Sequence, residues 1–67
     1  MNNYSLLDVV VLAKDMPGTE LKAGMRGTIV HIYSKPTLAY EVEFCDNKGK
    51  TIAALALQPE QLLPFNS

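Results

Sequence analysis

The side chains that could support chemistry are few in this chain of 67 residues, which holds one histidine, His31, and one cysteine, Cys45. Glu41 and Glu43 stand two apart in a stretch that alternates apolar and polar residues, so they share one face of a predicted strand. Paired carboxylates can perform acid–base catalysis in a cleft. A histidine combined with cysteine or carboxylate ligands can bind a metal ion.

For each of these side chains the sequence favours a structural interpretation. The spacing of His31 and Cys45 does not match a zinc site, and His31 is expected to point outward from its strand. No base or cation stands next to Cys45 to activate a thiolate. Glu41 and Glu43 are expected to be solvated, where they also discourage unwanted strand pairing. We therefore predict a protein that is not an enzyme, with no catalytic, cofactor-binding or metal-binding residues.

The glycines are predicted to shape the backbone and not to bind a ligand. In LKAGMRGTIVHIY, a phosphate-binding loop would need a helix to begin after Gly27, but β-branched residues follow instead. We expect Gly24 to end a long loop and Gly27 to let a strand bend over the core. Gly18 in DMPG and Gly49 in DNKG are expected to occupy turn positions with positive φ.

Short apolar runs separated by turn residues predict an all-β protein. The predicted strands cover residues 6–14, 26–33, 38–45, 51–57 and 62–65, and QPEQL forms one helical or 3-10 turn before the last of them. This order indicates a single domain over residues 1–67, a small and strongly bent antiparallel barrel. The predicted core consists of Val9, Val11, Ile29, Ile32, Tyr40, Val42, Phe44, Leu55, Leu57 and Leu62.

The blocks LLDVVVL, LKAGMRGTIVHIY, AYEVEF and LQPEQLLP, in this order, resemble a family of small uncharacterised bacterial proteins found largely in cyanobacteria and classified as a domain of unknown function. The block with Gly24, Gly27, Ile29 and Ile32 is also similar to the glycine-containing strands of KOW domains. Both resemblances imply a five-stranded SH3-like barrel. A proline-peptide site of the SH3 kind is not expected, because the chain has no tryptophan and three scattered tyrosines.

Composition and charge narrow the function further. Six Lys and Arg residues face seven Asp and Glu residues, for a net charge of −1, so we expect neither nucleic acid nor a membrane surface as the partner. One cysteine cannot form an internal disulfide, which favours a cytoplasmic protein. The N-terminal run has no basic flank and is interrupted by Asp8, so we do not expect a signal peptide or a membrane span.

Apolar residues also occur on both faces of two predicted strands, residues 6–14 and 51–57. In TIAALAL, three apolar residues alternate with three others, and a barrel has only one interior. Exposed apolar patches commonly mark partner surfaces, although loops and chain ends could also cover such a face. We predict binding of a partner protein or a second copy of this chain. The predicted partner-binding residues are Ile52, Ala54 and Ala56, with Arg26 and Lys48 in nearby loops.

The alternative function is weak RNA binding of the KOW type. It would use the loop from Lys22 to Arg26 together with Lys35. Strong salt dependence would identify it, because contacts with phosphates release counterions.

Overall fold

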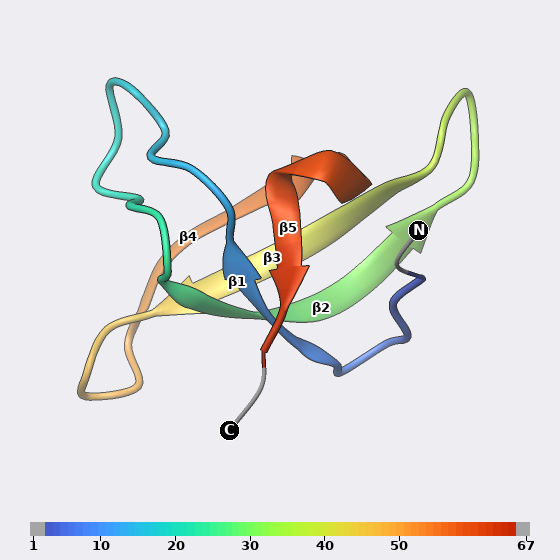
Figure 1. Cartoon of the computed structure of the whole chain (residues 1–67). Coiled ribbons are helices and arrows are strands. Elements are labelled where there is room, and N and C mark those ends of the chain that lie inside the picture. Colours follow the sequence, from blue (N-terminus) through green and yellow to red (C-terminus); the bar gives the residue numbers. More distant parts are fainter. Residues whose placement is uncertain (1–2, 66–67) are drawn as a thin grey trace.

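The structure, a computed structural model, describes residues 3–65 of the chain. It confirms an all-β, five-stranded SH3-like barrel with one short 3-10 turn before the last strand (Figure 1). The elements are β1 Val9–Leu12, β2 Arg26–Tyr33, β3 Ala39–Cys45, β4 Thr51–Leu57, η1 Pro59–Gln61 and β5 Leu62–Pro64. All strand pairs are antiparallel, in the order β4-β3-β2-β1-β5. In the described part of the chain, no helix is long and apolar enough to cross a membrane.

Strand β2 carries the bend of the barrel, and it curves across the centre of Figure 1. Its register against β3 shifts between Ile29 and His31, which leaves Val30 as the extra residue of a β-bulge. The bulge resets the alternation of side chains. Ile29 is therefore fully buried and Ile32, three positions later, also packs against the core.

Gly18 and Gly49 have the predicted positive φ, at 78° and 80°. Gly24, which was expected to end the long loop, also has a positive φ of 87°. The turn that contains Gly18 is closed by a hydrogen bond from the Thr19 N–H to the Met16 carbonyl, and the Gly24 N–H donates to the Leu12 carbonyl.

Gly27 serves packing. It is buried in β2, and a Cβ atom built there would lie 2.5 Å from Cγ1 of Val42 and 3.0 Å from the ring of Phe44. The absence of a side chain lets the backbone of β2 pass directly over these two core residues. Gly27 was expected to let the strand bend over the core; what its missing side chain allows is the close passage of the strand over Val42 and Phe44.

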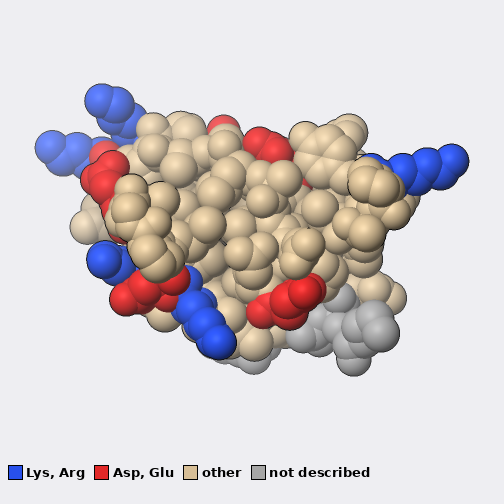
Figure 2. Space-filling model, turned by 90° about the horizontal axis from the view of Figure 1, so that it is seen from above, with Lys and Arg blue, Asp and Glu red and all other residues tan. Residues whose placement is uncertain are grey.

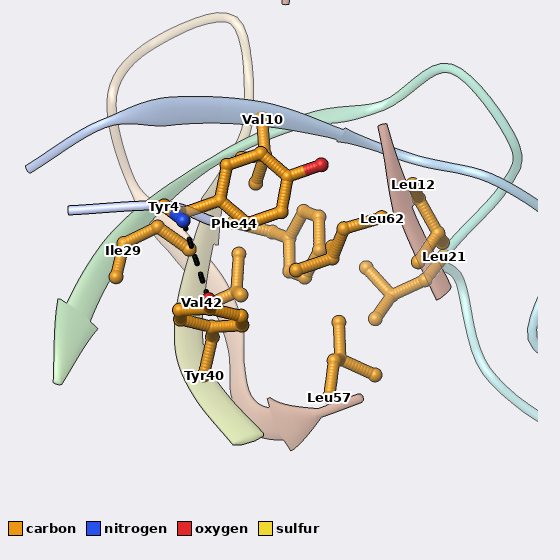
Figure 3. Close-up of a cluster of buried hydrophobic side chains, with 10 residues drawn as sticks. All are labelled: Tyr4, Val10, Leu12, Leu21, Ile29, Tyr40, Val42, Phe44, Leu57 and Leu62. Atoms are coloured by element: carbon orange, nitrogen blue, oxygen red, sulfur yellow. Dashed lines mark hydrogen bonds between the residues drawn. The ribbon is translucent and has the colours of Figure 1, made fainter. Parts of the chain in front are cut away.

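Ten apolar residues form one buried core, shown in Figure 3. They are Tyr4, Val10, Leu12, Leu21, Ile29, Tyr40, Val42, Phe44, Leu57 and Leu62. Six of these belong to the predicted core. Two further predicted members, Ile32 and Leu55, pack against it while half-buried.

The prediction for the first strand was wrong about its face. Val10 and Leu12 point into the core, whereas Val9 is exposed and Val11 is half-buried. The reason lies in the partner strand, because Val10 is paired with Gly27 and lies on the same side of the sheet. Val10 thus occupies the interior at the position where β2 contributes no side chain.

Two core residues come from segments outside the sheet, which the sequence pattern did not identify. Tyr4 precedes β1, outside the predicted strands, and its ring meets that of Tyr40 edge-on at 5.3 Å between centroids. Leu21 belongs to the long loop between β1 and β2. Both side chains fill space that the five strands leave uncovered.

Candidate interaction surface

The outer sides of β1 and β5 form an apolar face. Val11 is paired with Leu63 on β5 and with Arg26 on β2, and Val9 lies two residues away on the same side. Val9 is 44% exposed and Leu63 is 49% exposed, large fractions for aliphatic side chains. These residues lie side by side because antiparallel partners that face each other have close Cβ atoms.

Arg26 borders this apolar face and is held there by an aromatic ring. Its guanidinium carbon lies 5.0 Å from the centroid of the Phe65 ring, within the range of a cation–π contact. Phe65 therefore lies on the same side of the sheet as Arg26. We call Val9, Val11, Leu63 and Phe65 the β1–β5 outer face. Arg26, a predicted partner-binding residue, is its basic neighbour.

The turn before β1 adds two more exposed aliphatic residues. Leu6 is 57% exposed and Leu7 is 74% exposed. The backbone of Leu7 has φ of 70°, a left-handed conformation that residues with a side chain rarely adopt. Its N–H donates to the Ile29 carbonyl at 2.7 Å, which ties the turn to β2. A strained backbone that presents a leucine to solvent is a feature associated with functional positions.

The predicted patch on β4 does not form one continuous apolar surface. The register between β3 and β4 shifts so that Ile52 is the extra residue of a bulge, and Ile52 packs against the core. Ala54 and Ala56 are exposed on the outer side, opposite Glu43 and Glu41. A bulge cannot be recognised from the apolar pattern of TIAALAL, so strict alternation placed Ile52 on the wrong side.

Ile52 instead meets Arg26 at a shallow surface pocket. The pocket lies where β2 begins and β3 ends, and its lining also includes Cys45 and Asp46. Lys48 belongs to the hairpin beside it, where the Asp46 carboxylate accepts hydrogen bonds from the backbone N–H groups of Lys48 and Lys50. The structure thus brings Ile52, Arg26 and the hairpin together, while Ala54 and Ala56 lie farther along β4 and do not line this pocket.

The side chains that could support chemistry lie on the outer side of β2 and β3, where His31 and Tyr33 are exposed and Glu41 and Glu43 are half-buried. His31 is paired with Glu41, and its ring lies edge-on to Tyr33 at 4.6 Å between centroids. The Tyr33 hydroxyl donates to Oε1 of Glu41 at 3.3 Å. Partial shielding from water, followed by the negative charge of Glu41 and this hydrogen bond, raises the pKa of Tyr33 above its usual value.

Cys45 lies apart from that cluster. Its Sγ atom is exposed and lies 4.0 Å from the Thr51 hydroxyl. Over residues 3–65, no three His, Cys, Asp or Glu side chains are grouped so that they could hold a metal ion.

A family model for the domain of unknown function DUF4926 matches residues 6–64, almost the whole chain. The chain belongs to this family. No curated protein and no solved structure matched it. The cyanobacterial distribution and the similarity to KOW domains remain predictions.

Charges on this DUF4926 domain are dispersed. Figure 2 shows one face of the molecule, on which Lys and Arg side chains lie at opposite ends, Asp and Glu side chains lie between them, and the centre is uncharged. The Asp15 carboxylate accepts a hydrogen bond from the backbone N–H of Ala23, which belongs to the predicted nucleic-acid loop from Lys22 to Arg26. An acidic side chain therefore lies against the loop that would have to approach phosphates.

Proposed function

We propose that this chain is a cytoplasmic, non-catalytic interaction module that binds a partner protein through the β1–β5 outer face. The observation that carries the proposal is the exposure of Val9 and Leu63 on adjoining strands of an otherwise well-packed barrel. Burial of such side chains contributes about 25 cal/mol for each Å² removed from water. A protein partner with a matching apolar surface would provide that burial.

Arg26 defines the chemistry expected of the partner. Its contact with the Phe65 ring limits the freedom of the guanidinium, so less entropy is lost when it binds. A guanidinium binds a carboxylate through two parallel hydrogen bonds. We therefore expect an apolar partner surface with an Asp or Glu side chain placed to meet Arg26.

The titratable side chains support binding over catalysis. Glu41 accepts a hydrogen bond from Tyr33, and both residues lie on the outer side of the sheet beside His31. Cys45 is exposed beside a hydroxyl group. Catalytic acids and bases usually lie in clefts that shift their pKa toward neutrality, and these residues occupy an open surface.

A comparison of two surface variants tests the proposal. The tagged wild-type protein, Leu63→Lys and Ala56→Lys are used to capture partners from a lysate of the source cells, with and without nuclease, and the captured proteins are quantified by mass spectrometry. Both positions are exposed, so both variants should fold, which circular dichroism verifies. We expect Leu63→Lys to reduce capture of one nuclease-resistant protein about tenfold or more and Ala56→Lys to leave it unchanged.

Two results would contradict the proposal. If Ala56→Lys loses the partner and Leu63→Lys keeps it, the partner binds at β4 and not at the β1–β5 outer face. If capture disappears with nuclease and weakens steeply with salt, the chain binds nucleic acid and not a protein.

A further inference from the structure

We propose that β4 pairs antiparallel with β4 of a second copy of this chain, so that two barrels share one continuous sheet. The pairing uses a different surface from the β1–β5 outer face, and the two proposals can be tested separately. In the described part of the chain, β4 is hydrogen-bonded to β3 on one side and forms the edge of the sheet on the other. An unpaired edge presents backbone donors and acceptors to any strand that can approach it.

The two edges of the sheet differ in their protection. Strand β5 is three residues long and ends with Pro64, and both shortness and proline block strand addition. Strand β4 has seven residues, TIAALAL, with neither a charged residue nor a proline. Its one protective feature is the bulge at Ile52, which leaves Ala53–Leu57 as a regular stretch.

The side chains along β4 suit close approach of an identical strand. Ala54 and Ala56 present only methyl groups on the outer side. Leu55 faces the core side but remains half-buried, so part of its surface is open at the edge. In a pair centred on Leu55, each Ala54 faces Ala56 of the other copy, and the two Leu55 side chains cover each other.

Charges at the two ends of β4 favour antiparallel over parallel pairing with a second copy. The hairpin before the strand carries Lys48 and Lys50, and the 3-10 turn after it carries Glu60. Antiparallel pairing places the lysines of one copy near Glu60 of the other, whereas parallel pairing would bring like charges together. Glu41 and Glu43 on β3 would be separated from those of the other copy by three strand spacings, about 14 Å, beyond the range of strong repulsion in salt.

The loop between β1 and β2 leaves the later residues of β4, around Leu55, accessible. Residues Gly18–Leu21 lie beside Ile52 and Ala53 and line a shallow pocket with them. They therefore flank the beginning of β4, at the bulge residue Ile52 and at Ala53, the first residue of the regular stretch. The incoming strand would align with the later residues, centred on Leu55.

The test compares the mass in solution of the wild type with that of Ala54→Lys, by sedimentation equilibrium over a range of concentrations. A lysine at position 54 lies opposite Glu43 within the same barrel, which favours folding of the variant. In the dimer, however, it would place two lysines near the two-fold axis. We expect the wild type to form a dimer. The dissociation constant of the dimer should be at least about tenfold higher for Ala54→Lys.

Leu63→Lys is the matched control, because it adds the same charge to the outer face at the other edge strand. It should dimerise like the wild type. A wild type that remains monomeric at all concentrations would overturn the proposal. So would a dimer that Leu63→Lys disrupts and Ala54→Lys does not, which would assign self-association to the β1–β5 outer face.

A cross-linking experiment tests the register. In a Cys45→Ser background, a mixture of Ala54→Cys and Ala56→Cys chains should form a disulfide between the two variants more readily than either variant forms with itself. Stronger cross-linking of either variant with itself would overturn the pairing centred on Leu55.

Discussion

The backbone N–H of Tyr4 donates a hydrogen bond to the hydroxyl of Tyr40, which lies 36 positions later in the sequence, at 3.2 Å. Both side chains are buried, and the bond joins the segment before β1 to the beginning of β3, as the dashed line in Figure 3 shows. The N-terminal segment is thus attached to the barrel by a polar contact inside an apolar environment. A tyrosine at position 40 supplies both the ring that packs and the oxygen that accepts.

Tyr40→Phe should therefore destabilise the protein while preserving its packing. It leaves a buried N–H without this acceptor, at a cost of about 1–2 kcal/mol. Urea denaturation followed by circular dichroism would measure the change as a lower midpoint with an unchanged slope. Tyr33→Phe, which removes a hydroxyl from an exposed ring, is the control and should have the smaller effect. A Tyr40→Phe variant as stable as the wild type would show that the Tyr4–Tyr40 bond contributes nothing.

Gly27→Ala should destabilise the barrel by about 1–3 kcal/mol, because the new methyl group would overlap Val42 and press on Phe44. If this overlap causes the loss, a second substitution that removes the overlapping side chain should restore part of the stability. In Gly27→Ala combined with Val42→Ala, the space vacated by Val42 accepts the new methyl, so the double variant should be more stable than the sum of the two single losses indicates. Thermal unfolding of the four proteins checks this, and strictly additive losses would contradict the proposed overlap.

The orientation of β1 can be tested by paired substitutions on its two sides. Val10→Ala should cost about 2 kcal/mol, because Val10 is fully buried. Val9→Ala should change the free energy of unfolding by less than about 0.5 kcal/mol, because Val9 is largely exposed. Chemical denaturation of both variants measures the difference. A larger loss from Val9→Ala would mean that β1 packs with its other face.

Strand β1 shows why the sequence predicted the strands of the fold better than it predicted which of their faces are exposed. Strands β2 and β4 begin and end at the predicted residues because glycines, prolines and polar turns bound them. Three consecutive valines in β1 carry no alternation, so their inward face depends on the partner strand and on the missing side chain of Gly27. Local pattern therefore specifies the strand, and long-range pairing decides which side of it is buried.

Bulges account for the main difference at the predicted partner surface. Ile52 and Val30 each add one residue to a strand and reverse the alternation beyond them. The predicted burial of both Ile29 and Ile32 was consistent with such a bulge in β2, because two residues three apart cannot otherwise share a face. No comparable spacing in TIAALAL signalled the bulge in β4. The β1–β5 outer face was also missed, because Val9 and Val11 were assigned to the core.

The hydrogen bond between Tyr33 and Glu41 predicts a loss of stability in alkali. Because the pKa of Tyr33 is raised in the folded protein, the unfolded chain releases this proton first as the pH rises. The stabilisation is therefore complete below the ordinary tyrosine pKa, near 10, and is lost as the pH rises through the folded value. Ultraviolet titration of the phenol should show the raised pKa in the wild type and a lower one in Glu41→Gln. Identical titration curves would rule out the contribution of Glu41.

Leu7→Gly should separate backbone strain from partner binding. Glycine adopts positive φ without the steric cost that a leucine carries there, about 1–2 kcal/mol. The leucine side chain is largely exposed, so its removal forfeits little burial. We expect the midpoint of thermal unfolding to stay constant or rise. If the turn before β1 extends the β1–β5 outer face, capture of the partner should fall in the same variant. A stability loss comparable to that of Val10→Ala would show instead that Leu7 contributes to the folded barrel rather than to its contacts with other proteins.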